Sequence, residues 1–277
     1  MAFRYKRLYR KVTRSIGRNV GLVTTETGQS SDIMNIRRTV PDHLMRRKEQ
    51  AMSKMLSSVS KQAHAELASW QAEFSPLVEK ALSAEAARTV LSELPTEFSR
   101  LLERMPDPGP QMRAFSVGGA IYIALYLVLQ RQGMSAAQVW PICDAATRQR
   151  FAKMSKLTKW LLSWTMFSAP WRFLTKRLAA QSKQSPVGGW EVDYLPAQPG
   201  QFDYGVTYRR CAIAQLAHDV GAQDFAPYIC QSDIIGSEVF GWGLARSKTI
   251  AQGDSHCDFR FRKGAPTDVK VKLPVIS

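Results

Sequence analysis

The chain has 277 residues, of which 45% are hydrophobic and 10% are aromatic, and it carries a formal net charge of +15 at pH 7. This composition can supply a sizeable buried core, and it excludes a chain that is disordered throughout. The 4 cysteines are too few for a disulfide scaffold and lack the CxxC spacing of a zinc ribbon, so we expect reduced thiols.

The positive charge is concentrated in two segments. Residues 1–20 contain seven lysines and arginines, residues 145–190 contain nine, and neither segment has an acidic residue. The rest of the chain is close to neutral, so we expect two local basic surfaces on an ordinary globular protein. The first of these segments lacks the apolar stretch and the cleavage site of a secretory signal, and a cytoplasmic location is therefore the default expectation.

Three regions are expected along the chain. Residues 1–40 are polar, basic and rich in Ser and Thr, which predicts a partly disordered tail. Residues 41–110 form a helical N-terminal region, because the sequence from Pro41 through Trp70 is rich in Ala, Glu, Lys and Leu and predicts a long helix. Residues 111–277 carry the chemical motifs and are expected to form an α+β domain.

Two breaks are expected in the helical region. Ser83 is a suitable N-cap for a helix that runs to Leu94, where Pro95 is expected to stop it. The run "MPDPGP" at 105–110 contains three prolines and a glycine, which cannot continue a helix. This run is the clearest break in the chain.

An apolar helix is expected over residues 113–132, ended by Gly133. Its longest apolar run, at 115–129, falls short of the roughly 18 to 20 residues of a membrane span. We therefore expect a buried helix, and an alternative is that this helix forms a dimer interface, so the oligomeric state stays open. Ser135 is expected to cap the helix that follows.

The segment 148–182 is predicted to be helical, with tryptophan, leucine and phenylalanine near helical spacing, flanking lysines and a kink at Pro170. Two interpretations stay open: an aromatic core with solvated lysines, or a face that contacts a membrane surface together with residues 1–20. Nucleic-acid binding is not expected, because the basic and the stacking residues separate along the helix.

The last third of the chain changes to strand patterns. "FDYGVTY" at 202–208 alternates apolar and polar residues and predicts a half-buried strand, and the next short helix is expected to end at Gly221. "GLARSKTIA" and "HCDFRFR" bracket "QGDS" and predict a β-hairpin. The predicted fold class is α+β, with a helical N-terminal two-thirds packed on a small C-terminal antiparallel sheet.

Two cysteines stand beside acidic residues. In a strand, Cys257 shares one face with two phenylalanines, whereas His256 and Asp258 point to the other face, so a reaction partner of Cys257 must come from elsewhere in the chain. Cys230 and Asp233 are three residues apart, a spacing that one helical turn places on one face. The alternative for each thiol is a packed cysteine of the core. No pair of cysteines and histidines has metal-ligand spacing, so no metal is expected.

Four motifs occur in order along the last third: "YRRC" at 208–211, "YICQSD" at 228–233, "ARSKTIAQG" at 245–253 and "HCDFRF" at 256–261. Together they resemble the L-2-amino-thiazoline-4-carboxylic acid hydrolase family, whose pattern contains C-x2-D followed by R-x2-T-[IL]-x2-G-x3-C-D-F. The apolar helix and the glycine-containing turn before these motifs also look like this family. The resemblance covers about residues 110–263.

The resemblance implies hydrolytic opening of a cyclic C–N bond in a small-molecule substrate, without a cofactor. The implied roles are a cysteine nucleophile, a carboxylate that moves the proton, and an arginine that holds an anionic group. The alternative is a non-catalytic module that binds a hydrophobic ligand or a membrane surface. Of the two thiols we favour Cys257 as the nucleophile, because its strand neighbours fix it. The implied catalytic residues are Cys257, Cys230, Asp233 and Asp258, and the implied substrate-binding residues are Arg246, Thr249 and Gly253.

Overall fold

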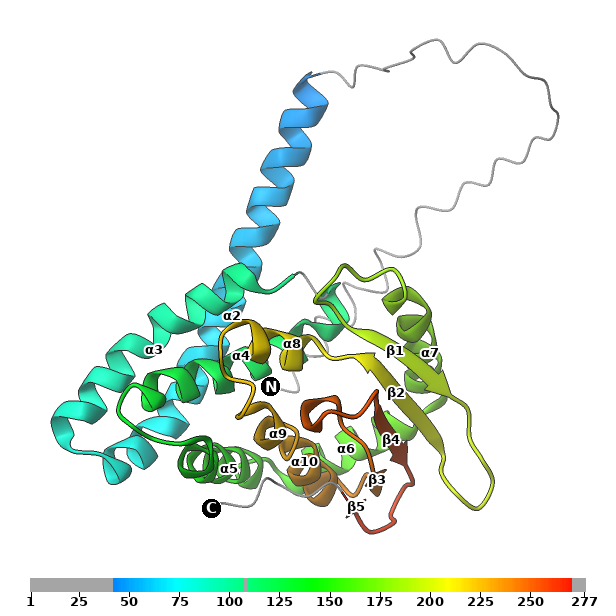
Figure 1. Cartoon of the computed structure of the whole chain (residues 1–277). Helices are drawn as coiled ribbons and strands as arrows, with labels where there is room; N and C mark the ends of the chain where they lie inside the picture. Colours follow the sequence, from blue (N-terminus) through cyan, green and yellow to red (C-terminus); the bar gives the residue numbers. More distant parts are fainter. Residues whose placement is uncertain (1–41, 107–108, 271–277) are drawn as a thin grey trace. The chain divides into compact units, whose positions relative to one another are not determined.

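The structure is a computed structural model that describes residues 42–106 and 109–270 (Figure 1). The expected tail at 1–40 lies outside the described residues. Residues from Ser57 onward belong to one compact unit, and helix α2 (Asp42–Ala81) begins before that unit. The following description concerns the compact unit.

Four long helices carry the larger of two hydrophobic cores. Ser83 caps α3 as predicted, since its hydroxyl accepts the backbone N–H of Ala86 at 3.3 Å. Ser135 likewise precedes the last of the four helices, and its N–H donates to Gln138 Oε1 at 2.9 Å. The four helices are α2, α3 (Ala84–Arg104), α4 (Gly109–Gln130) and α5 (Ala136–Ala152).

Pro95 does not end its helix, contrary to the prediction. It lies inside α3, which continues to Arg104. A proline has no N–H for the carbonyl four residues earlier, here Leu91, and this carbonyl would be left without a donor. Gln71 of α2 supplies the donor, because its Nε2 binds Leu91 O at 2.9 Å. A side chain from the neighbouring helix thus satisfies the carbonyl that the proline frees.

Helix α4 is a core helix, as predicted. Its stretch Met112–Gln130 is apolar and long enough to cross a membrane, but 67% of this stretch is buried inside the protein, which is typical of a core helix. Ile121, Leu125 and Leu129 are fully buried against the surrounding helices. The chain itself covers these three side chains, so they are not available to a dimer interface, and the alternative of a dimer stays a prediction for the exposed remainder of the helix.

The segment 148–182 is divided into more than one helix. Its first residues belong to α5, and the rest forms α6 (Lys156–Phe167) and α7 (Ala169–Ser182). The break lies at Ser168 and not at Pro170, which sits in the first turn of α7, where a proline costs no hydrogen bond. Ser168 Oγ donates to Thr165 O at 2.7 Å and accepts the N–H of Trp171 at 3.4 Å, so one residue ends α6 and begins α7.

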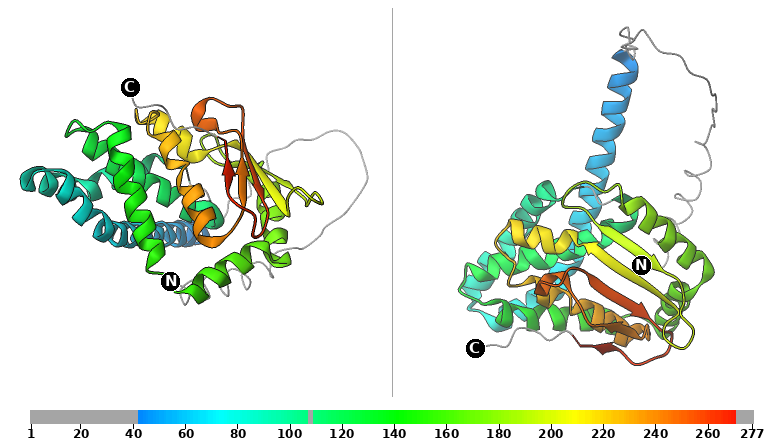
Figure 2. Two further views of the ribbon diagram at one scale, coloured as in Figure 1. Left: turned by 90° about the horizontal axis from the view of Figure 1, so that it is seen from below. Right: turned by 45° about the vertical axis from the view of Figure 1, so that its right-hand side comes forward.

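The last third forms a five-stranded sheet in the order β1-β2-β4-β3-β5 (Figures 1 and 2). All neighbouring pairs are antiparallel except β3 and β5, which are parallel, so the sheet is mixed at this edge. This α+β arrangement confirms the predicted fold class. The strands are β1 (Glu191–Leu195), β2 (Tyr204–Arg210), β3 (Leu244–Arg246), β4 (Cys257–Phe261) and β5 (Asp268–Val269).

Short helices connect the strands. The predicted hairpin exists as the pair β3 and β4, but only Leu244–Arg246 of "GLARSKTIA" is a strand, and the connection contains a 3₁₀ helix, η2 (Ile250–Gln252). Gly221, with a φ of 74°, follows the helix that it was expected to end. The helices between β2 and β3 are α8 (Ala212–Asp219), α9 (Ala226–Ile229) and α10 (Ser232–Phe240).

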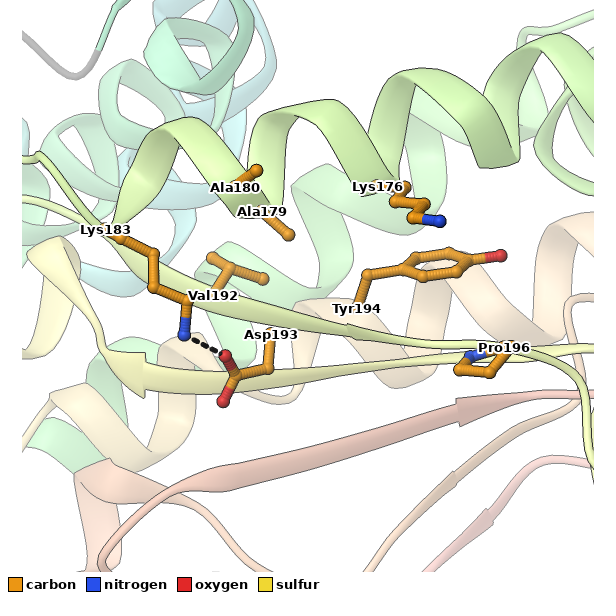
Figure 3. A pocket seen from close by; sticks show the side chains of 8 residues that line it. All are labelled: Lys176, Ala179, Ala180, Lys183, Val192, Asp193, Tyr194 and Pro196. Atoms are coloured by element: carbon orange, nitrogen blue, oxygen red, sulfur yellow. Dashed lines mark hydrogen bonds and ion pairs between the residues drawn. The ribbon is translucent and has the colours of Figure 1, made fainter.

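One face of the sheet carries the second hydrophobic core. The register places Tyr208 opposite Cys257 and Val206 opposite Phe259, so these four side chains share a face, as the alternation predicts. Helix α7 packs against β1 on this face, and Figure 3 shows the side chains of Val192 and Tyr194 between strand and helix. The motif cysteine of β4 is therefore part of this core.

Candidate active site

Cys257 begins β4 and is 6% exposed. Its sulfur accepts the backbone N–H of Ile250 at 3.2 Å and lies 3.7 Å from the hydroxyl of Thr249. The connection between β3 and β4 folds back to make both contacts. The strand and this connection therefore hold the thiol in one position.

Cys230 reaches the same hydroxyl from another element. It is the C-cap of α9 and is half-buried, and its sulfur lies 3.5 Å from Thr249 Oγ1. Thr249 itself is fully buried, and its N–H donates to Asp254 at 2.8 Å. The two predicted thiols, distant in sequence, thus meet at one threonine.

Arg246 binds both members of the second pair predicted from the sequence, Cys230 and Asp233. Its guanidinium is fully buried, donating from Nη1 to Asp233 Oδ2 at 2.9 Å and from Nη2 to Cys230 O at 3.0 Å, and it lies 5.0 Å above the ring of Phe259. Its Nε has no partner within the described part of the chain. A buried cation is costly unless it is paired, and Asp233, 43% exposed at the start of α10, supplies the opposite charge.

Both thiols are protonated at neutral pH. Burial raises the pKa of Cys230 to about 11, although the charge of Arg246 and the hydroxyl of Thr249 act in the opposite direction. Burial also raises the pKa of Cys257, and the N–H of Ile250 opposes this effect. Any reaction of these sulfurs therefore requires a group that removes the proton.

Asp258 lies on the opposite face of β4 from the thiols, as the alternation predicts. Its carboxylate accepts the N–H groups of Ser247 and Lys248 at 2.9 and 2.6 Å and the hydroxyl of Ser247 at 2.7 Å. Partial burial alone would raise the pKa of Asp258, but these hydrogen bonds together lower it. The structure therefore places this carboxylate at the turn after β3 and does not bring it to the sulfur of Cys257.

Gly253 also shapes this connection. It ends η2 with a φ of 92°, in the left-handed region that glycine adopts without strain. The turn returns the chain toward β4 and lets Asp254 reach the N–H of Thr249. Gly253 thus helps to fix the threonine that both thiols contact.

Cys211 is a third thiol close to Cys230 and Cys257, and the sequence motifs assigned it no role. Cys211 is the N-cap of α8, and its sulfur accepts the N–H of Ala214 at 3.4 Å. Burial raises the pKa of Cys211, and the proximity of Cys230 and Cys257 raises it further. The signal was present in the sequence, because Cys211 directly precedes a helical pattern, and a helix N-terminus is a position that activates thiols.

A surface depression of about 320 Å³ lies beside Cys211. Its wall includes Ile250, the residue whose N–H binds Cys257, so the depression adjoins the thiol group. The lining is rich in donors and small side chains. It consists of Gly188, Gly189, Arg209, Arg210, Cys211, Ala214, Gln215, His218, Gln223, Ala226, Ile250 and Ala251.

A second depression, of about 300 Å³, lies between α7 and β1 (Figure 3). It is lined by Lys176 and by an ion pair between Lys183 and Asp193, together with small and aromatic side chains. None of the residues predicted for the reaction lines either depression. Among the described residues, no group of three or more His, Cys, Asp and Glu side chains is arranged to hold a metal ion.

The comparison with known families agrees with this arrangement. The protein is of the α+β class and carries the motifs of a hydrolase at its sheet. Residues 115–261 match the L-2-amino-thiazoline-4-carboxylic acid hydrolase family. The chain belongs to this family. No curated protein and no solved structure matches the chain. The matched segment contains the three thiols, Arg246 and Thr249, which supports a hydrolase-like function.

Proposed function

We propose that the protein opens a C–N bond of a small cyclic substrate by attack of a cysteine in this thiol group. The observation that carries the proposal is the convergence of Cys230 and Cys257 on the hydroxyl of Thr249, within 3.5 and 3.7 Å, next to the buried guanidinium of Arg246. A hydrolase of cyclic amidines needs a nucleophile, a proton carrier and a positive charge in one place. All three lie within the segment that matches the family.

Cys230 is the thiol that the geometry favours as nucleophile, although the sequence favoured Cys257. Cys257 is 6% exposed and its sulfur is held by a backbone N–H, whereas Cys230 is half-buried and has the hydroxyl of Thr249 as its hydrogen-bonding contact. Asp233 follows Cys230 by three residues and is 43% exposed. Cys230 is therefore the less buried of the two thiols by accessible surface, and it has a carboxylate close in sequence to receive its proton.

The proposed reaction has two halves. The sulfur of Cys230 adds to the amidine-like carbon while its proton passes through Asp233 to the ring nitrogen, and the ring C–N bond breaks. Water then adds to the same carbon, the bond between this carbon and the sulfur of Cys230 breaks, and a proton from the water returns to that sulfur. Arg246 is a positioning residue in this scheme, because it binds both the carbonyl of Cys230 and the carboxylate of Asp233.

The test is turnover of 2-amino-thiazoline-4-carboxylate by purified single variants. We expect Cys230→Ser to abolish ring opening and Asp233→Asn to lower kcat by about 10² to 10⁴-fold. Cys143→Ala is the matched control, because this thiol is buried in the separate helical core. Full turnover by both Cys230→Ser and Cys257→Ser would exclude the thiol mechanism.

A second candidate function is binding of the same kind of small molecule without catalysis. The raised pKa of each of the three thiols favours it, because protonated thiols are weak nucleophiles. Calorimetric titration with 2-amino-thiazoline-4-carboxylate separates the two functions. Saturable binding without turnover by the unmodified protein would support the binding module.

A further inference from the structure

Helix α6 presents an apolar stripe to solvent. Leu157, Trp160, Leu161 and Trp164 are 72%, 62%, 43% and 51% exposed. Their spacing of i, i+3, i+4 and i+7 places them on one side of the helix. An amphipathic helix of a soluble protein normally turns such a stripe toward the core, and this helix turns it outward.

Other residues of α6 hold the helix on the protein. Met166 and Phe167 pack against the core on the sheet, and α6 contacts α7 and α10. The stripe is therefore not the result of a detached helix, because the helix is anchored and still exposes its apolar side chains. Exposed apolar patches of this kind mark surfaces that bind a partner.

The charge around the stripe identifies the chemistry of that partner. Residues 145–190 contain nine lysines and arginines and no acidic residue, and four of the nine, Arg148, Arg150, Lys153 and Lys183, form ion pairs with acidic residues from outside the segment. Of the others, Lys156 borders the stripe on α6, Lys159 lies on the other side of that helix, and Lys176 and Arg177 lie on α7. Such a surface repels a second copy of itself and the basic residues 1–20, and it attracts an anionic partner.

We propose that α6 docks the protein on an anionic lipid surface. Tryptophan prefers the boundary between lipid headgroups and hydrocarbon, leucine prefers the hydrocarbon, and lysine pairs with acidic headgroups. The helix has 12 residues and is therefore about 18 Å long, enough to lie in the plane of the headgroups without crossing the bilayer. Leu157 and Leu161 favour lipid over single-stranded nucleic acid, because aliphatic side chains offer no ring on which a base can stack.

The test is flotation of the full chain with vesicles of equal parts phosphatidylserine and phosphatidylcholine. We expect binding, a blue shift of the tryptophan emission, and little binding to pure phosphatidylcholine. Trp160→Ala with Trp164→Ala is expected to remove the blue shift and most of the binding. Lys156→Gln with Lys159→Gln is expected to weaken the binding by about 25-fold, since each basic residue near an anionic surface contributes about fivefold.

Matched control variants test whether a loss of vesicle binding is specific to the apolar stripe of α6. Phe115→Ala removes an exposed aromatic side chain of α4, and Lys61→Gln with Lys80→Gln removes two exposed charges of α2. Both controls are expected to bind like the unmodified protein, and every variant should retain its thermal unfolding curve and ring-opening activity. Equal binding by the tryptophan variant and the unmodified protein would overturn the proposal, as would loss of vesicle binding to a competing single-stranded oligonucleotide. The result is independent of the proposed reaction, because the thiol group is unchanged in every variant.

Discussion

Helices α4 and α6 are both rich in apolar residues, but the apolar side chains of α4 are buried and several of those of α6 are exposed to solvent. In α4, Leu125 and Leu129 are fully buried, whereas in α6, Leu157 and Leu161 are 72% and 43% exposed. Helices α3, α5 and α8 contact α4, while α6 is held from one side by α7 and α10. An apolar pattern therefore predicts a helix, but it does not indicate whether the chain buries the apolar side chains of that helix.

The largest expected effect separates these two helices directly. Leu125→Ala should lower the free energy of unfolding by about 2 to 5 kcal/mol, because it removes a fully buried side chain and leaves a cavity. Leu161→Ala should change it by no more than about 0.5 kcal/mol, because water already reaches the side chain that is removed. Urea denaturation followed by circular dichroism measures both values.

The two leucine variants also control each other, since the chemical change is the same and only the environment differs. Equal destabilisation by both would contradict the comparison, because it would mean that α6 buries its stripe against the chain in solution. A concentration-dependent unfolding midpoint for the unmodified protein would indicate the same for a second copy.

A smaller effect is expected where the helical core satisfies its polar groups internally. Gln71→Leu should lower the free energy of unfolding by about 1 to 3 kcal/mol, because the carbonyl of Leu91 loses its donor in a partly buried position. Pro95→Ala restores a backbone N–H to that carbonyl. A double-mutant cycle should therefore show a smaller cost of Gln71→Leu when residue 95 is alanine, and equal costs would exclude this role of Gln71.

The smallest expected effect concerns the reactivity of two thiols, Cys230 in the candidate site and Cys143 in the helical core. At pH 8 about one Cys230 side chain in a thousand is a thiolate, because its pKa is about 11, and alkylation by iodoacetamide should rise about tenfold per pH unit up to that value. Cys143, whose pKa burial raises further, should react more slowly at every pH. Mass spectrometry of the alkylated peptides measures both rates.

The variant Arg246→Met tests the effect of the guanidinium on the pKa of Cys230. Removal of the guanidinium takes away a charge that lowers the pKa of Cys230, so alkylation at a fixed pH should slow. Faster alkylation would instead show that the variant has opened the site. The sign for stability follows from the same shift: the contribution of a neutral Cys230 is fully present below pH 9, the ordinary thiol pKa, and is lost as the pH rises through about 11.

Local patterns in the sequence were sufficient for much of the fold. The alternation in "HCDFRF" correctly predicted that Cys257 and the phenylalanines face the core, and Ser83 and Ser135 correctly predicted helix starts. The end of α3 was predicted wrongly, because Gln71 compensates for Pro95 from another helix and no local pattern contains that contact.

The candidate site also depends on contacts between distant residues, which the local sequence patterns could not predict. The motifs contained Cys230, Asp233, Arg246 and Cys257, but their spacing could not show that Arg246 is buried and binds Asp233 and the carbonyl of Cys230. Such contacts arise when β3 and the turn before α10 come together in space. The exposure of Trp160 and Trp164 could not be predicted from the sequence either, since an apolar stripe has the same periodicity whether it faces the core or solvent.

Ser168 sets the direction in which α6 faces. It closes α6 through Thr165 and opens α7 through Trp171, with no further residue between the two helices. Helix α7 is itself packed on β1. The tryptophans of α6 are therefore carried by a helix that is joined without a spacer to one packed on the sheet, so the docking proposed for α6 would also orient the domain and its thiols.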